Sequence, residues 1–285
     1  MTPPAIDSGA LARSVAAALA EDLGPAGDVT TLASVPADRT ARASFVAREA
    51  MVLAGLPAVV ETFRQLDRRV TVRALVQEGA SVSGGTIVAE AAGPARALLA
   101  GERTALNFLQ RMSGIATATR AAVDEIRGTG ATILDTRKTA PGLRALDKYA
   151  VAAGGGTNHR LGLFDAAMIK DTHLAAAVSL GAAVRACRAA GLDPSRITAE
   201  VRNLSELSEA IEAGAGRALL DNMTVDELAR CVRAAKGKIV LEASGGLRPG
   251  VLREVAATGV DCLSLGYLTH SVRAADLAMD LTAAP

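Results

Sequence analysis

The feature that most constrains the fold is a pattern that repeats six times from residue 131 onward. An apolar run ends in a polar residue or a glycine, and an alanine-rich amphipathic segment follows. The run ends are separated by 35, 30, 21, 21 and 24 residues, each enough for a strand, a helix and two loops. Such alternation predicts a parallel sheet with right-handed crossovers. The run ends lie at Asp135, Lys170, Glu200, Asp221, Glu242 and Gly266.

Six strand–helix units predict an α/β fold resembling an incomplete TIM-like barrel. A doubly wound sheet is the alternative. We favour the barrel because polar residues end almost every strand, as strand ends around one pocket require. The strands are expected at 131–135, 166–170, 197–201, 218–222, 239–243 and 262–266. The helices are expected at 142–153, 174–190, 204–213, 224–236, 248–257 and 271–282.

The first hundred residues follow different periods and predict an α+β layer. Strand-like alternation marks residues 41–48, 70–76 and 85–91, and helical spacing marks residues 8–22 and 57–67. A further helix is expected at 97–112, where it bridges this region and the barrel.

Composition excludes several classes of protein. A net charge of +1 gives no long-range attraction to nucleic acid or to a membrane surface. No apolar stretch approaches the 18 residues that a membrane span requires, so a cytoplasmic protein is expected. Cys187, Cys231 and Cys262 lie far apart in apolar or helical segments and predict buried thiols rather than disulfides.

Basic side chains cluster after the first two strands of the repeat. The chain has only five lysines, and the first of them, Lys138, directly follows an apolar strand beside Arg137. A G-G-G-T-N-H-R segment then supplies His159 and Arg160, and Lys170 ends the next strand. These five groups suit a small substrate with several negative charges. The alternatives are ion pairs with nearby acids and, for Lys170, a Schiff-base nucleophile.

Two carboxylates and two glycine-containing strand ends complete the candidate site. Glu200 and Asp221 end successive strands and suit Mg²⁺ when phosphates supply its other ligands, although pairing with Arg or Lys is equally open. The segments A-S-G-G (243–246) and S-L-G (264–266) each precede a helix and predict a phosphate site. His270 is expected to open the last helix as a cap or a phosphate contact.

Taken together, the motifs resemble the quinolinate phosphoribosyltransferase family. They are D-T-R-K-T-x-P-G-L-R, G-G-G-x-N-H-R-x-G-L, I-K-D-x-H, L-L-D-N-M, L-E-A-S-G-G and L-G-Y-L-T-H-S, with E-D-L-G-P-A-G-D-V-T-T and E-R-T-A-L-N-F-L-Q-R-M before them. The resemblance covers nearly the whole chain in order. It implies a type II phosphoribosyltransferase fold, with an N-terminal α/β sandwich over 1–112 and an open barrel over 113–285. Packing of the C-terminal residues back onto the sandwich is compatible with these bounds.

The resemblance implies transfer of a phosphoribosyl group from phosphoribosyl pyrophosphate to quinolinate, with decarboxylation to nicotinate mononucleotide, in NAD biosynthesis. It implies Mg²⁺ as cofactor, held at Glu200 and Asp221. It implies a homodimer with shared active sites, or a hexamer, and no nucleic-acid or membrane partner. The catalytic residues implied are Lys138, Lys170, Glu200 and Asp221. The substrate-binding residues implied are Arg103 from the partner subunit, Thr136, Arg137, Lys138, His159, Arg160, Lys170, Ser244, Gly245, Gly246, Ser264, Leu265, Gly266 and His270.

Two positions depart from the family pattern. Thr172 stands where asparagine is usual, and the A-E-V-R segment lacks the first acid of the common E-V-E-V and ends in Arg202. These departures leave open a paralogue that uses nicotinate or another pyridine acid without decarboxylation. A Schiff-base aldolase centred on Lys170 and a non-catalytic binding protein of the same fold are the remaining alternatives.

Overall fold

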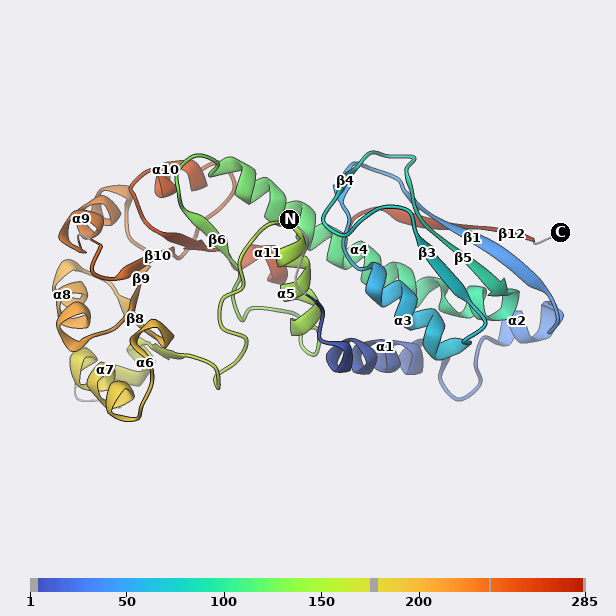
Figure 1. The fold of residues 1–285 in the computed structure, drawn as a ribbon, viewed down its shortest axis with the longest axis horizontal. Coiled ribbons are helices and arrows are strands. Elements are labelled where there is room, and N and C mark those ends of the chain that lie inside the picture. The colour runs from blue at the N-terminus through green and yellow to red at the C-terminus, as the bar shows by residue number, and fades with distance from the viewer. Residues whose placement is uncertain (1–4, 175–178, 236, 284–285) are drawn as a thin grey trace. The chain divides into compact units, whose positions relative to one another are not determined.

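The computed structural model describes residues 5–174, 179–235 and 237–283, and it divides into two compact units (Figure 1). The first unit comprises Met1–Arg120, Thr139–Gly155 and Leu268–Pro285, and the second comprises Ala121–Lys138 and Gly156–Tyr267. No helix among the described residues is both long and apolar enough to cross a bilayer.

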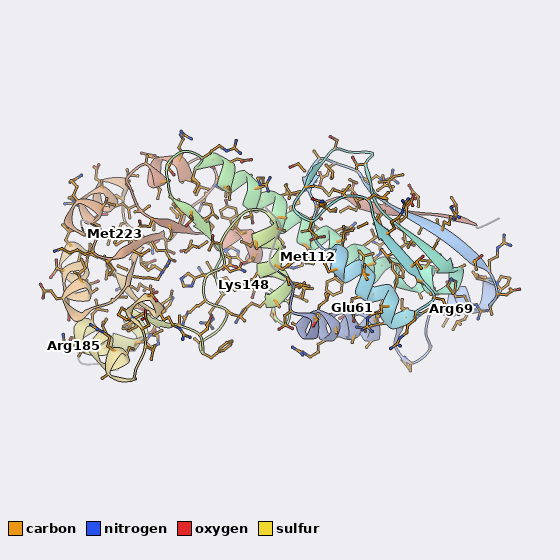
Figure 2. All side chains as sticks on the ribbon, viewed as in Figure 1. Glu61, Arg69, Met112, Lys148, Arg185 and Met223 are labelled. Carbon is orange, nitrogen blue, oxygen red and sulfur yellow. The ribbon has the colours of Figure 1, made fainter. Side chains whose placement is uncertain are left out.

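The first unit is built on a four-stranded antiparallel sheet in the order β12-β1-β5-β3. Helices α3 and α4 pack on it through an apolar cluster, in which the rings of Phe45 and Phe63 meet edge to face at 6.2 Å. Met112 of α4, labelled in Figure 2, is also buried. The elements are α1 (Ser8–Leu23), α2 (Val29–Ser34), β1 (Thr40–Ala47), β2 (Met51–Val52), α3 (Leu56–Leu66), β3 (Thr71–Ala74), β4 (Ser81–Val82), β5 (Ile87–Pro94), α4 (Ala95–Glu125), α5 (Arg144–Ala153), α11 (Tyr267–His270) and β12 (Leu277–Ala283).

The expectation of a helix at 271–282 is wrong, because this segment contains strand β12. Residues 277–283 pair antiparallel with β1. Leu277 and Met279 are buried and alternate with the exposed Asp280, which is the period of a strand. The segment is rich in alanine and leucine, which favour helix, but pairing along the edge of β1 satisfies its backbone and overrides that preference.

The second unit is a parallel six-stranded sheet in the order β6-β11-β10-β9-β8-β7. Consecutive strands from β7 to β11 are neighbours, and β6 pairs with β11 rather than with β7. This order confirms the incomplete TIM-like barrel, because in a doubly wound sheet the order of the strands reverses near the middle of the sheet. The strands are β6 (Thr132–Leu134), β7 (Ala167–Ile169), β8 (Ile197–Val201), β9 (Arg217–Asp221), β10 (Val240–Ser244) and β11 (Cys262–Ser264).

Helices follow these strands close to the expected positions. They are α6 (Asp171–Leu174), α7 (Leu180–Ala189), η1 (Pro194–Arg196), α8 (Leu204–Ala213), α9 (Val225–Ala235) and α10 (Leu252–Ala256). The expected helix at 248–257 is therefore shorter, and the one at 97–112 extends as α4 to Glu125. The parts of the expected helices that fall on 175–178 and 236 lie outside the described residues.

Candidate active site at the carboxyl ends of the strands

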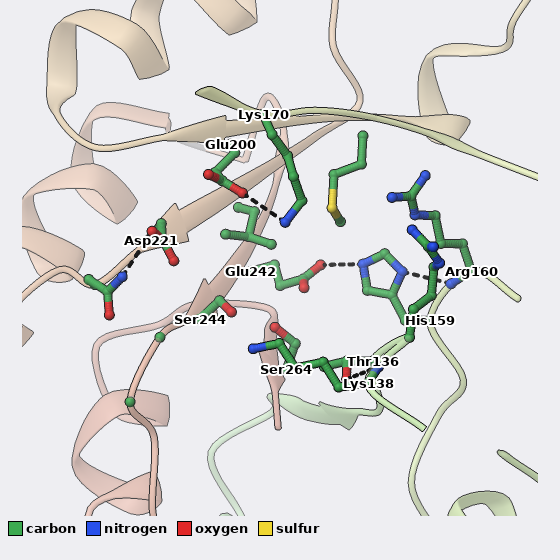
Figure 3. A pocket seen from close by; sticks show the side chains of 16 residues that line it. Thr136, Lys138, His159, Arg160, Lys170, Glu200, Asp221, Glu242, Ser244 and Ser264 are labelled. Atoms are coloured by element: carbon green, nitrogen blue, oxygen red, sulfur yellow. Dashed lines mark hydrogen bonds and ion pairs between the residues drawn. The ribbon is translucent and has the colours of Figure 1, made fainter. Parts of the chain in front are cut away.

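A cavity of about 540 Å³ lies at the carboxyl ends of the strands of the second unit (Figure 3). This volume is in the range of small-molecule sites, and the position is where barrels carry function. Its lining consists of Thr136, Arg137, Lys138, His159, Arg160, Met168, Lys170, Glu200, Leu219, Asp221, Asn222, Glu242, Ser244, Gly245, Gly246 and Ser264.

The strand register explains why residues so distant in sequence meet. Glu200 pairs with Leu219, which in turn pairs with Glu242, so the three side chains form one row on the same face. Asp221 pairs with Ser244 in the next row along the same face. Side chains two residues apart on a strand share a face, and all five therefore point into the cavity.

The cationic side of the cavity comes from the loop after β6 and from the segment before β7. The Thr136 hydroxyl accepts the backbone N–H of Lys138 at 3.0 Å and shapes this loop. Arg160 donates to the carbonyl of Ala166 at 2.9 Å. Burial and the nearby charge of Arg137 lower the pKa of the Arg160 guanidinium, and Asp165 opposes this effect. Cations this close favour an anion between them.

His159 is fixed from both sides by this segment. Thr157 forms a parallel bridge with Leu134, so the segment extends the sheet beyond β6. The backbone N–H of His159 donates to Asp135 at 2.7 Å, and the backbone N–H of Arg160 donates to the Nδ1 atom of His159 at 2.6 Å. The other ring nitrogen, Nε2, lies 3.3 Å from the carboxylate of Glu242.

Glu242 is fully buried, yet it keeps its charge. Burial raises the pKa of its carboxyl, but contacts with His159, Ser264 and Arg217 outweigh burial and bring this pKa below its ordinary value. The sequence marks Glu242 as a strand end but does not mark it as a site residue. Glu242 ends the I-V-L-E-A run in the same way that Glu200 and Asp221 end their apolar runs. This shared position is the sequence signal that could have identified Glu242 as a site residue.

Lys170 forms an ion pair with Glu200, with Nζ and Oε2 3.4 Å apart. The lysine side chain is 44% exposed. A Schiff-base lysine requires a desolvated amine with a lowered pKa. A half-exposed lysine beside a carboxylate has the opposite surroundings, so the aldolase alternative loses its physical basis.

The glycine segment after β10 approaches β9 closely. The N–H of Asn222 donates to the carbonyl of Ser244, and its side chain donates to Asp221 at 2.9 Å. Gly245 has φ +94°, and a Cβ added there would lie 2.3 Å from the Asn222 Oδ1. Only glycine fits this position, and Gly245 and Gly246 line the cavity with backbone alone.

The two expected Mg²⁺ ligands come from neighbouring strands of the second unit. Glu200 and Asp221 end adjacent strands, and both line the cavity. Among the described residues no group of three or more His, Cys, Asp or Glu side chains could hold a metal. Two carboxylates fit Mg²⁺ only in the mode in which substrate phosphates supply the other oxygens.

The remaining expected residues lie outside this lining as described. Leu265 is buried, and its N–H donates to Leu134, with Gly266 next in sequence. Arg103 on α4 and His270 belong to the first unit. His270 ends α11 rather than opening a helix, which corrects that expectation. Of the two departures from the family pattern, Arg202 forms an ion pair with Asp171, and the backbone N–H of Thr172 donates to the same side chain.

Comparison with known proteins identifies relatives along nearly the whole chain. The N-terminal domain of quinolinate phosphoribosyl transferase matches residues 28–113, and the C-terminal domain of the same family matches residues 115–280. Nicotinate-nucleotide pyrophosphorylase (carboxylating) from Mycobacterium leprae is 46% identical, over 93% of this chain and 94% of the relative.

Two further relatives agree. Quinolinate phosphoribosyltransferase (decarboxylating) 1b from Nicotiana tabacum is 37% identical, over 98% of this chain and 84% of the relative. The solved structure of the nicotinate-nucleotide pyrophosphorylase from Francisella tularensis is 37% identical and superposes with a TM-score of 0.90, over 99% of both chains.

Proposed function

The chain belongs to the quinolinate phosphoribosyl transferase family, and we propose that it transfers a phosphoribosyl group from phosphoribosyl pyrophosphate to quinolinate. The products would be nicotinate mononucleotide, pyrophosphate and CO₂, as the decarboxylating name of its tobacco relative indicates. This reaction belongs to NAD biosynthesis.

One observation carries the proposal: a single cavity combines cationic groups, three strand-end carboxylates and a glycine cradle. The cations suit the two carboxylates of a pyridine diacid. The backbone of Gly245 and Gly246, which no side chain covers, suits a sugar phosphate. Such a combination matches a reaction that joins these two substrates.

In the proposed mechanism, Arg137, Lys138, Arg160 and Lys170 bind and orient the carboxylates of quinolinate. The pyridine nitrogen then attacks C1 of the ribose as pyrophosphate leaves through an oxocarbenium-like state. The protein contributes mainly orientation and charge compensation, because the step requires no covalent bond to the enzyme. Lys138 and Lys170 are proposed to be catalytic residues that contact the reacting groups of the two substrates.

Glu200 and Asp221 are proposed to hold the Mg²⁺ that accompanies phosphoribosyl pyrophosphate and to face the ribose hydroxyls. A bound Mg²⁺ would supply neutralising charge to the departing diphosphate. Ser244, Gly245, Gly246 and Ser264, with Leu265, Gly266 and His270 from the following strand and helix, are proposed to surround the 5′-phosphate.

Decarboxylation follows from the chemistry of the product ring. The N-ribosylated pyridinium accepts the electron pair left at C2 when the adjacent carboxylate departs as CO₂, and the carbon then takes a proton. A strong grip on that carboxylate would oppose its loss. The cations are therefore proposed to hold it out of the ring plane rather than to neutralise it fully.

We also propose a homodimer in which Arg103 of each subunit completes the partner's site. If so, mixing an Arg103→Ala chain with a Lys138→Ala chain should restore part of the activity that each lacks alone, since one site of each hybrid dimer is intact. Absence of any recovery in proven hybrids would contradict the shared site. The cytoplasmic location stays a prediction.

The function is tested by incubating the purified protein with quinolinate, phosphoribosyl pyrophosphate and Mg²⁺. Nicotinate mononucleotide, pyrophosphate and CO₂ should form in equal amounts. The matched control is nicotinate, which lacks the 2-carboxylate. Turnover of nicotinate in place of quinolinate, or pyrophosphate release without CO₂, would contradict the proposal.

A further inference from the structure

Four residues form a chain of contacts that begins at Arg217 and ends at the cationic rim, and three of them, Glu242, His159 and Arg160, line the cavity. Arg217 of β9 lies 3.4 Å from the carboxylate of Glu242, and Glu242 lies 3.3 Å from the Nε2 atom of His159. The Nδ1 atom of His159 accepts the backbone N–H of Arg160 at 2.6 Å. Figure 3 shows the histidine ring between Glu242 and the Arg160 backbone.

These contacts fix the tautomer of His159. An Nδ1 atom that accepts an N–H carries no proton of its own, so the ring proton resides on Nε2. Nε2 lies 3.3 Å from the Glu242 carboxylate, close enough for electrostatic attraction, although the two atoms are not aligned for a hydrogen bond. Nε2 is itself buried, and the histidine side chain is only 10% exposed. Both nitrogens therefore lie close to protein groups, and the residue lines the cavity.

Arg160 needs such support more than its neighbours do. It is partly buried beside Arg137, and the two like charges repel. Its guanidinium is held by the Ala166 carbonyl, but its backbone is held by the histidine ring. If the ring turned, the backbone N–H of Arg160 would lose its hydrogen-bond acceptor. The guanidinium group would then no longer be held in one orientation. A misplacement of about 1 Å at such a group is enough to reduce turnover strongly.

We propose that Glu242 is a positioning residue that acts through His159: it locks the ring, and the ring aims Arg160 at the carboxylates of the acceptor. Arg217 balances the buried charge of Glu242 from below. The part of this proposal that concerns the acceptor rests on the proposed function.

The first test needs no substrate and no variant of Glu242. Long-range ¹H–¹⁵N NMR of the wild-type protein distinguishes the tautomers of its three histidines, and a His159→Asn sample assigns the signal. The proposal predicts a ring that carries its proton on Nε2 and none on Nδ1. A ring protonated on Nδ1, or one exchanging between both forms, would overturn it whatever reaction the enzyme performs.

The second test separates acceptor binding from the rest of the reaction. Glu242→Gln removes the charge and keeps the shape, so the KM for quinolinate should rise about tenfold or more, the size expected for a lost charged hydrogen bond. The KM for phosphoribosyl pyrophosphate should stay the same. Because Arg217 loses its counter-charge in this variant, a Glu242→Gln, Arg217→Gln double variant is measured beside it and should show the same rise.

Glu78→Gln is the matched control, since Glu78 is a partly buried carboxyl of the first unit that accepts the N–H groups of Gly55 and Leu56. Its kinetic constants should not change. A wild-type KM for quinolinate in the folded Glu242 variants would overturn the proposal. A wild-type enzyme that does not turn over quinolinate would instead refute the proposed function, and comparison of the His159 tautomer in the wild type and in Glu242→Gln would still test whether Glu242 holds the ring.

Discussion

Each unit of the protein contains a buried carboxylate that meets a partly exposed arginine. In the first unit, Asp147 accepts two bonds from Arg111 at 2.8 and 2.9 Å and a third from the N–H of Ala140 at 3.1 Å. In the second, Glu242 lies 3.4 Å from Arg217 and shares its carboxylate with His159. Both carboxylates are fully buried, and both arginines are 26% exposed.

The difference lies in how completely each charge is satisfied. Asp147 has the two-pronged geometry that gives an arginine–carboxylate pair most of its strength. Glu242 has longer contacts that are divided between an arginine and a histidine facing the cavity. Burial of a charge thus serves two purposes in one chain: in the first unit it stabilises packing, and in the second it orients a site.

The largest expected effect is on stability. Asp147→Asn should lower the free energy of unfolding by about 3–5 kcal/mol, because it leaves Arg111 without its counter-charge. Urea denaturation measures this loss. The double variant Arg111→Met, Asp147→Leu should recover most of it, since an apolar pair carries no desolvation cost. A single variant as stable as the wild type would show that the two pairs do not differ as described.

Removal of a rim cation should affect catalysis rather than stability. Lys138→Ala or Arg160→Ala should lower kcat/KM for quinolinate, because a charge that binds a buried carboxylate is lost. The fall should correspond to a loss of about 2–5 kcal/mol of transition-state stabilisation. Arg185→Ala, at an exposed arginine of α7 labelled in Figure 2, is the control and should keep full activity. Near-normal turnover by both rim variants would show that these cations do not bind the acceptor.

A smaller effect is expected at the glycine cradle. Gly245→Ala should raise the KM for phosphoribosyl pyrophosphate, because its methyl group would collide with Asn222 in addition to the roughly 1–2 kcal/mol strain of a left-handed backbone. Gly250→Ala is a close control, since Gly250 has φ +93° and open space around it. Equal kinetic constants for the two variants would mean that the close approach does not shape the site.

The smallest expected effect is a pair of opposite pH dependences. Glu242 has a lowered pKa in the folded state, so its contribution to stability is present above about pH 4.3 and is lost as pH falls through the folded pKa. Burial raises the pKa of Glu78, so its contribution is present below about pH 4.3 and is lost as pH rises through that raised pKa.

Unfolding of the wild type, Glu242→Gln and Glu78→Gln between pH 3 and pH 7 measures both contributions. The difference between wild type and Glu242→Gln should grow with pH, and the difference for Glu78→Gln should shrink. Parallel curves would contradict the assignment of opposite environments to the two carboxyls.

Sequence patterns predicted the strand ends well because each strand of a parallel sheet is a continuous apolar run that stops at a polar residue. Ile197–Val201 was predicted without error, and the other barrel strands were predicted to within two residues at either end. The same patterns predicted that Lys170, Glu200 and Asp221 would meet in one cavity. The boundary between domains at residue 112 stays a prediction.

What the sequence could not predict depends on partners far away along the chain. The strand at Leu277–Ala283 exists because β1 offers an edge more than two hundred positions earlier. Likewise, the tie between Glu242 and His159 depends on strand register and on a ring orientation that no local pattern encodes. Local propensity describes neither kind of contact.

The most direct test of the central claim is a crystal structure with quinolinate and a non-reactive analogue of phosphoribosyl pyrophosphate bound with Mg²⁺. We predict the two carboxylates against Lys138, Arg160 and Lys170, and the diphosphate toward Glu200 and Asp221, in the cavity of the second unit. Quinolinate bound elsewhere, or those three cations turned away from it, would contradict the account.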